Sequence, residues 1–325
     1  QDIEARTKAI LRDESIFARK AIDSSYSFIN IATFDRSRVI YSKEQMRQLE
    51  ANIYTIIKNT ERAVAANIPL KRGVLLYGPY GTGKTLTALY AASLCVENGW
   101  TFILVRPGDN IDAAISMAQK VQPAVVFFED IDAAAKEERD SDVNVILNTI
   151  DGVLSKDSRV MVILTTNHIE RVNPAMLRPG RLDAVIKLGE LDREGIIHFV
   201  RDCAVDAHGK TMLDGELDED AVYEAAKGYV PAFLKEAVSK AALYAISRGA
   251  FNGVSAHLSS EDIVNALNEL RPQYEYMVQP RTEKKVTFDD MVASVANSVA
   301  NDVVKKKVES REVYLDHNDD EIKHA

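Results

Sequence analysis

Short, continuously apolar runs alternate with stretches of helical apolar spacing through the first 190 residues or so. We predict buried strands over residues 73–77, 101–105, 125–128, 160–164 and 185–188. Helical patterns cover residues 42–66, 86–92, 111–121 and 143–154. Such an alternation is typical of an α/β fold, a parallel sheet with helices on both faces. Ligands bind such sheets at the carboxyl ends of the strands.

The pattern changes after about residue 191, where strand signals stop and helical periodicity continues to residue 277. We therefore predict a small all-α domain after the sheet. Weaker amphipathic patterns lie at both ends of the chain, including an apolar stripe over 288–303 before a polar tail. The predicted division is an N-terminal helical extension (1–33), the α/β domain (34–191), the helical domain (192–277), and a linker with an amphipathic helix and tail (278–325).

Composition narrows the class of protein. The chain has 325 residues, 46% hydrophobic and 27% charged, which is an ordinary soluble balance. No apolar run approaches the roughly 20 residues that cross a bilayer, so we expect no membrane segment. Cys95 and Cys203 lie in apolar helical contexts and indicate buried thiols in a reducing, cytoplasmic location. The net charge of -9 disfavours nucleic acid as a partner, although a local basic channel stays possible.

The strongest motif is the sequence GPYGTGKT at residues 78–85, which fits the phosphate-binding pattern G-x-x-x-x-G-K-[ST] between a strand and a helix. Glycines allow backbone N–H groups to surround phosphate oxygens. Lys84 is expected to reach the β- and γ-phosphates and the Thr85 hydroxyl to bind Mg²⁺. The predicted nucleotide-binding residues are Pro79, Tyr80, Gly81, Thr82, Gly83, Lys84, Thr85 and Leu86.

Polar residues follow the later strands. Glu129 and Asp130 end the 125–128 strand and could hold Mg²⁺ and orient the attacking water. Asn167 ends the next strand, where its amide could hold the water or the γ-phosphate. Arg178 and Arg181 flank a Pro-Gly turn and form a rigid fork suited to a phosphate in a neighbouring subunit.

Together and in this order, these motifs resemble those of the AAA+ ATPases over about residues 34–277. The resemblance implies an α/β nucleotide domain with a helical lid, Mg²⁺ and ATP as ligands, and assembly into a hexameric ring. It implies Walker A at 78–85, Walker B at Glu129 and Asp130, sensor 1 at Asn167, and arginine fingers at Arg178 and Arg181. Ala232 is similar in position to residues that hold adenine.

Within the family, the GPxGTGKT loop and the Arg-Pro-Gly-Arg turn resemble the protein remodellers of the p97, katanin and fidgetin types. The order Glu129 then Asp130 is inverted and looks like the mitochondrial Rieske-protein translocase branch. We expect slow hydrolysis, with Glu129 nearer Mg²⁺ and Asp130 nearer the water. The candidate pore loop, 106–110, has no aromatic residue, so the ring either does not thread polypeptide or grips it by other contacts.

The leading hypothesis is a Mg²⁺-dependent ATPase that forms a homo-oligomeric ring and remodels an unidentified protein client. Two alternatives stay open: a DNA-associated motor or loader, and a slowly hydrolysing ATP-gated scaffold. Stimulation of ATP turnover by DNA would distinguish the first alternative from the leading hypothesis. The dependence of ATP turnover on protein concentration would distinguish the second alternative from the leading hypothesis.

Overall fold

The computed structural model describes residues 14–32, 34–36, 39–131, 158–172, 174 and 181–278. The chain divides into two compact units, residues 1–277 and 278–325, so almost every described residue belongs to the first unit. Arg178 and the predicted helices over 143–154 and 288–303 lie outside the described residues.

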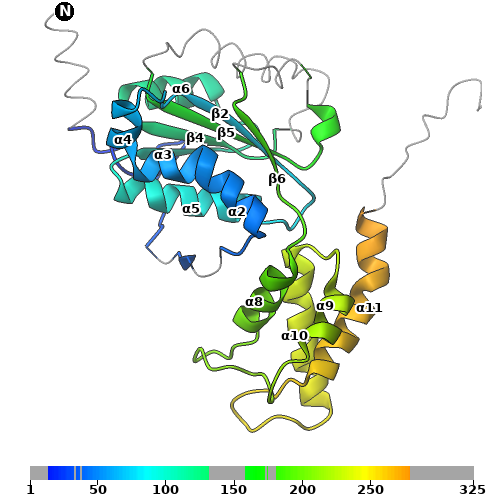
Figure 1. The fold of residues 1–325 in the computed structure, drawn as a ribbon. Helices are drawn as coiled ribbons and strands as arrows, with labels where there is room; N and C mark the ends of the chain where they lie inside the picture. The colour runs from blue at the N-terminus through cyan, green and yellow to red at the C-terminus, as the bar shows by residue number, and fades with distance from the viewer. Residues whose placement is uncertain are drawn as a thin grey trace, which may run out of the picture. The chain divides into compact units, whose positions relative to one another are not determined.

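A six-stranded parallel sheet forms the centre of the α/β part (Figure 1). Its strands are β1 (Ala21–Asp23), β2 (Arg72–Tyr77), β3 (Thr101–Val105), β4 (Ala124–Phe128), β5 (Val160–Thr166) and β6 (Ala184–Lys187). They are arranged in the order β1-β3-β4-β5-β2-β6, and every neighbouring pair is parallel. The predicted fold class is confirmed. Strand β5 lies between β2, which precedes the phosphate-binding loop at residues 78–85 (the P-loop), and β4, which precedes Glu129 and Asp130.

Strand β1 replaces part of the helix that was predicted near the N-terminus, so that prediction is wrong over residues 21–23. Ala21 and Ile22 are buried in two different core clusters, on opposite faces of the sheet. This alternation has the period of a strand, and β1 pairs with β3 through Ala21 opposite Phe102 and Asp23 opposite Leu104. The open edge of β3 thus decides the conformation of a segment whose own pattern is ambiguous.

Helices cover both faces of the sheet. One core cluster joins the sheet to α2 (Lys43–Leu49), the π-helical turn η2 (Glu50–Tyr54), α3 (Thr55–Lys58), α4 (Thr60–Ala65) and α5 (Lys84–Glu97). A second cluster joins the opposite face to α6 (Ile111–Lys120). Ser42 starts α2 with a capping box, in which its hydroxyl accepts from the Gln45 N–H. The short 3₁₀ helix η4 (Ile169–Arg171) follows β5.

The region after β6 is helical, as predicted. It contains α8 (Arg193–Cys203), α9 (Glu219–Ala226), α10 (Pro231–Ser247) and α11 (Ser260–Val278), which share a third core cluster (Figure 1). Among the described helices, none combines the length and the apolar character needed to cross a membrane.

Candidate nucleotide-binding site

The P-loop connects β2 to α5. At two of its positions the backbone has a conformation that only glycine adopts easily. Gly81 and Gly83 have φ of +83° and +94°. Gly83 is the N-cap of α5 and supplies no side-chain cap, so the first N–H groups of this helix are available to an anion. A pocket of about 310 Å³ lies here, lined by Tyr80, Gly81, Gly83, Lys84, Thr85, Leu86, Asp130 and Asn167.

Lys84 is folded back onto the loop. Its ammonium donates hydrogen bonds to the carbonyl oxygens of Gly78 at 2.8 Å and Pro79 at 3.0 Å. The residue is buried, and a buried ammonium needs such acceptors to offset its desolvation. Phosphate oxygens in the same pocket could take over this task with a stronger, charge-assisted bond.

Two hydroxyl groups contact the P-loop backbone at Gly83. Sequence reasoning did not identify either of them. The hydroxyl oxygens of Tyr41 and Thr87 lie 3.2 and 3.1 Å from the carbonyl oxygen of Gly83 and within hydrogen-bond distance of each other, so one hydroxyl can donate to the carbonyl while the other donates to it. Burial raises the pKa of Tyr41 to about 12, although the bond to Thr87 acts in the other direction. Thr87 could have been found from its four-residue spacing to Gly83, whereas no sequence signal links Tyr41 to the loop.

Only one member of the acidic pair reaches this pocket. Asp130 has φ of +44°, its N–H donates to the Thr165 hydroxyl at 2.9 Å, and its carboxylate accepts from the Asn167 amide at 3.0 Å. Glu129 is half-buried and donates its N–H to the Val105 carbonyl at 2.9 Å, which extends the β3–β4 pairing by one residue. Its side chain is not among those that line the pocket.

The helical region touches the P-loop at Ala232, near the start of α10. The Ala232 N–H donates to the Gly81 carbonyl at 3.2 Å. A Cβ atom at Gly81 would lie only 2.6 Å from the Ala232 Cβ, so a glycine is required for this close approach. Cys203, at the end of α8, packs at the edge of the helical core and does not line the P-loop pocket.

Arg181 lies at the other edge of the sheet. A Cβ atom at Gly73 would lie 2.3 Å from the Arg181 carbonyl oxygen, and the Gly73 N–H donates to the Asp183 carboxylate at 2.9 Å. Gly73 is near the start of β2, whereas the P-loop follows its end. At 3.3 Å per strand residue, about 16 Å separates Gly73 from Gly78. The structure therefore does not bring Arg181 to the P-loop of its own chain.

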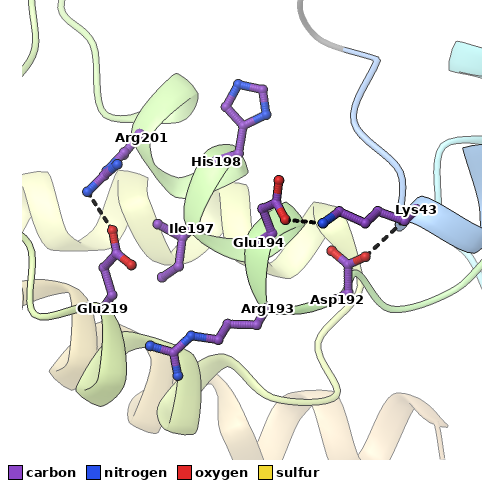
Figure 2. A pocket seen from close by; sticks show the side chains of 8 residues that line it. All are labelled: Lys43, Asp192, Arg193, Glu194, Ile197, His198, Arg201 and Glu219. Carbon is purple, nitrogen blue, oxygen red and sulfur yellow. Dashed lines mark hydrogen bonds and ion pairs between the residues drawn. The ribbon is translucent and has the colours of Figure 1, made fainter.

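A second pocket, of about 600 Å³, lies between the start of α2 and α8 (Figure 2). Asp192 accepts the Gly195 N–H at 2.8 Å with one carboxylate oxygen and the Lys43 N–H at 2.9 Å with the other. The Lys43 ammonium also pairs with Glu194. Asp192 thus holds the first turns of two helices together, and this pocket contains none of the predicted site residues.

The side-chain oxygen atoms in the P-loop pocket are suitable ligands for Mg²⁺. The Thr85 hydroxyl and the Asp130 carboxylate line the same pocket, and both are oxygen ligands of the kind that Mg²⁺ prefers. Phosphate oxygens and water usually complete its octahedral shell.

A glycine loop with a buried lysine, facing a carboxylate and an amide at the carboxyl edge of a parallel sheet, defines a P-loop protein that binds nucleoside triphosphates. Residues 74–190 match the model of the ATPase family associated with various cellular activities (AAA). The chain therefore carries an AAA domain, the domain that defines the AAA+ ATPases.

Two kinds of relatives are similar to this chain. The ATP-dependent zinc metalloprotease FtsH 2 of Symbiobacterium thermophilum is 30% identical over 296 residues, covering 82% of this chain and 46% of that protein. The probable mitochondrial chaperone bcs1 of Schizosaccharomyces pombe is 35% identical over 176 residues, covering 49% of this chain and 38% of that protein. The chain spans about half the length, or less, of the curated relatives it matches. Membership of the p97, katanin and fidgetin group is not confirmed.

Proposed function

We propose that this protein hydrolyses ATP with Mg²⁺ in a ring of identical subunits and uses the energy to remodel a protein partner. The observation that carries the proposal is one pocket that gathers Lys84 and Thr85 from the P-loop, Asp130 from the end of β4 and Asn167 from the end of β5. When bound, Mg²⁺ neutralises phosphate charge in such sites.

Each side chain has a distinct task in this proposal. Lys84 exchanges its two carbonyl acceptors for β- and γ-phosphate oxygens. Asp130 accepts the proton of the attacking water, and the Asn167 amide holds its carboxylate in place. The predicted role of Glu129 as the Mg²⁺ ligand stays a prediction, because Glu129 is not among the residues that line the pocket.

The ring is supported by the place of Arg181. An arginine held at the amino edge of the sheet is remote from its own P-loop, and assembly into a ring would bring it toward the site of an adjacent subunit. An arginine supplied in this way stabilises the charge that develops on the transferred phosphoryl group. A protein client is favoured because the named relatives are a protease and a chaperone.

Mixing two inactive variants tests the shared site. Lys84→Ala removes phosphate binding, and Arg181→Ala removes the proposed arginine, so each variant alone should lose most turnover. A mixture should regain activity, because a Lys84→Ala subunit can lend its Arg181 to a neighbour with an intact P-loop. Arg159→Ala is the matched control: this exposed arginine directly precedes β5, at the same edge of the sheet as Arg181.

The result can contradict the proposal at two levels. No phosphate release by the parent protein with Mg²⁺ and ATP would reject hydrolysis. Full turnover in Arg181→Ala, or no recovery in the mixture, would reject the shared site while leaving hydrolysis intact. Stimulation by DNA and not by unfolded protein would favour the DNA-associated alternative.

A further inference from the structure

Strand β4 lies between β3 and β5, and the backbone changes its hydrogen-bond partner where β4 ends. The Glu129 N–H still donates to the Val105 carbonyl, which continues the pairing with β3. One residue later, Asp130 has a φ of +44°. The N–H groups of Asp130 and Ile131 then both donate to Thr165 of β5, at 2.9 Å each. A single residue of β5 thus binds the two peptide groups at this turn.

Thr165 makes these two bonds with different atoms. Its carbonyl oxygen accepts the Ile131 N–H, whereas its hydroxyl accepts the Asp130 N–H and donates to the Phe128 carbonyl at 3.3 Å. The strand register explains this reach, because Phe128 pairs with Leu164 and Thr165 is the next residue of β5. The hydroxyl therefore joins the last residue of β4 to the residue with the positive φ.

Packing alone does not explain a hydroxyl at this position. Thr165 is 1% exposed and belongs to a strand that is buried along its whole length. Valine has the same branched shape and suits a buried strand without a polar group that must be removed from water. The hydrogen bonds at the turn supply a reason for threonine, because without the hydroxyl the Asp130 N–H would lose its acceptor.

The end of β5 also holds the Asp130 side chain. Asn167, two residues after Thr165, donates its amide to the Asp130 carboxylate at 3.0 Å. Thr165 fixes the peptide of Asp130 and Asn167 fixes its carboxylate. Asp130 and Asn167 line the P-loop pocket, whereas Thr165 does not. An effect of the Thr165 hydroxyl on the chemistry is therefore expected to pass through Asp130.

We propose that Thr165 is a positioning residue for ATP hydrolysis, whose hydroxyl holds the turn that directs the Asp130 carboxylate into the P-loop pocket. The proposal rests on the proposed function, in which Asp130 accepts the proton of the attacking water. Misplacing a reacting group by about 1 Å can cost about 100-fold in rate. The turn also suits the order of the acidic pair, because Glu129 stays in the pairing with β3 and the next residue enters the pocket.

The test compares side chains that differ in the hydroxyl. Thr165→Val keeps the shape of the side chain without the hydroxyl, whereas Thr165→Ser keeps the hydroxyl. We expect kcat to fall about tenfold or more in Thr165→Val, with KM for ATP within about twofold of the parent. Thr165→Ser should keep most of the parent kcat. Thr165→Ala compared with Thr165→Ser isolates the hydroxyl again, so the test holds even where Thr165→Val does not fold.

Thr101→Val is the matched control, because Thr101 makes the same contacts at the opposite edge of the sheet. Thr101 is also 1% exposed, and its hydroxyl accepts the N–H of Arg19, whose φ is +59°, at 2.9 Å. The same hydroxyl donates to the Val121 carbonyl at 3.0 Å. Thr101 begins β3, so it lies at the amino edge, away from the P-loop pocket. Both valine variants should lower the melting temperature, but only Thr165→Val should lower kcat.

Adding Thr165→Val to Asp130→Asn separates positioning from a general loss of structure. Asn tolerates a positive φ, so Asp130→Asn keeps the turn and lacks the proton acceptor. The added substitution should change the remaining kcat by less than about twofold, because the carboxylate through which Thr165 acts is gone.

Three results would contradict the positioning role: parent-like kcat in the variants without the hydroxyl, an equal fall in Thr101→Val, or a further tenfold fall, about the effect of the single substitution, in the double variant. Failure of the proposed function gives a different result. No ATP turnover in the parent protein, or parent-like turnover in Asp130→Asn alone, would reject the proposed chemistry of the site itself.

Discussion

The side-chain amide of Asn167 donates a 3.0 Å hydrogen bond to the carboxylate of Asp130. The two residues are 37 positions apart in the chain and come from the ends of neighbouring strands, β5 and β4. The amide fixes the direction of the carboxylate within the P-loop pocket. Asp130 is therefore the acidic residue whose loss should affect the chemical step most directly.

Asp130→Asn removes the proposed proton acceptor while keeping the size of the side chain. We expect kcat to fall by about 100-fold or more, since a general base typically contributes that much. Affinity for a fluorescent ATP analogue should stay within a few fold of the parent. Phosphate release and fluorescence titration measure the two quantities, and Asp112→Asn, an exposed residue in the first turn of α6, serves as control. Parent-like turnover in Asp130→Asn would reject this role.

Gly81→Ala probes the contact between the P-loop and the start of α10. The new methyl group meets the Ala232 Cβ at 2.6 Å, and alanine is also strained at a φ of +83°. Gly108→Ala is the matched control, because Gly108 has φ of +94° but nothing within 4 Å of an added Cβ. Both variants should lose roughly 1–2 kcal/mol of stability from the backbone alone. Only Gly81→Ala should lose more and bind nucleotide more weakly; equal losses would show that the Ala232 contact is unimportant.

Tyr54, at the end of the π-helical turn η2, has a fully buried hydroxyl that makes no hydrogen bond with the described residues. Tyr54→Phe removes a desolvated polar group and should leave the free energy of unfolding unchanged or raise it by up to about 1 kcal/mol. Tyr229→Phe is the opposite case, because the Tyr229 hydroxyl donates to the Leu267 carbonyl at 2.7 Å. That variant should lose about 1 kcal/mol. Urea unfolding compares the two, and a large loss in Tyr54→Phe would contradict the assignment.

Tyr41 predicts a specific alkaline dependence of stability. Its pKa is raised from 10.0 to about 12, mainly by burial, so its contribution is complete below pH 10 and is lost as the pH rises toward the folded value. Tyr41→Phe should be about 1 kcal/mol less stable than the parent at pH 8, because it lacks the bonds to the loop. Above pH 10 the parent loses up to about 1.4 kcal/mol per pH unit from this group, and the variant does not. Urea unfolding at pH 8, 10 and 11 should therefore show a shrinking difference, and a constant difference would count against the buried phenol.

The elements that sequence reasoning placed well are those with strong local patterns. The β3 strand was predicted with the bounds it has, and β2, β4, β5 and β6 were each predicted within two residues at either end. Strands β3, β4 and β5 are buried along their whole length and β2 is buried except at its two ends, so their own composition determines them, whereas β6 is buried only at Ile186. Strand β1 was missed because its three residues form a strand only by pairing with β3.

The features of the candidate site also fall into two groups, those that could be predicted from the sequence and those that could not. The residues of the P-loop and the polar ends of β4 and β5 could be read from motif and spacing. Three relationships could not: the support of Gly83 by Tyr41, the approach of Ala232 to Gly81, and the presence of Asp130 but not Glu129 in the lining of the pocket. Each depends on the direction of a side chain or on contact between segments far apart in the chain.

The sequence by itself determined that this protein has a parallel α/β sheet with a helical region after it, and a phosphate-binding loop with acidic and amide partners. Periodicity and motif spacing carry that information because they reflect interactions between near neighbours in the chain. Only the tertiary structure decided that Asp130 and not Glu129 lines the pocket, and that Arg181 lies beside the start of β2, whereas its own P-loop follows the end of that strand. Those features follow from strand order and register, which join distant segments through hydrogen bonds and packing.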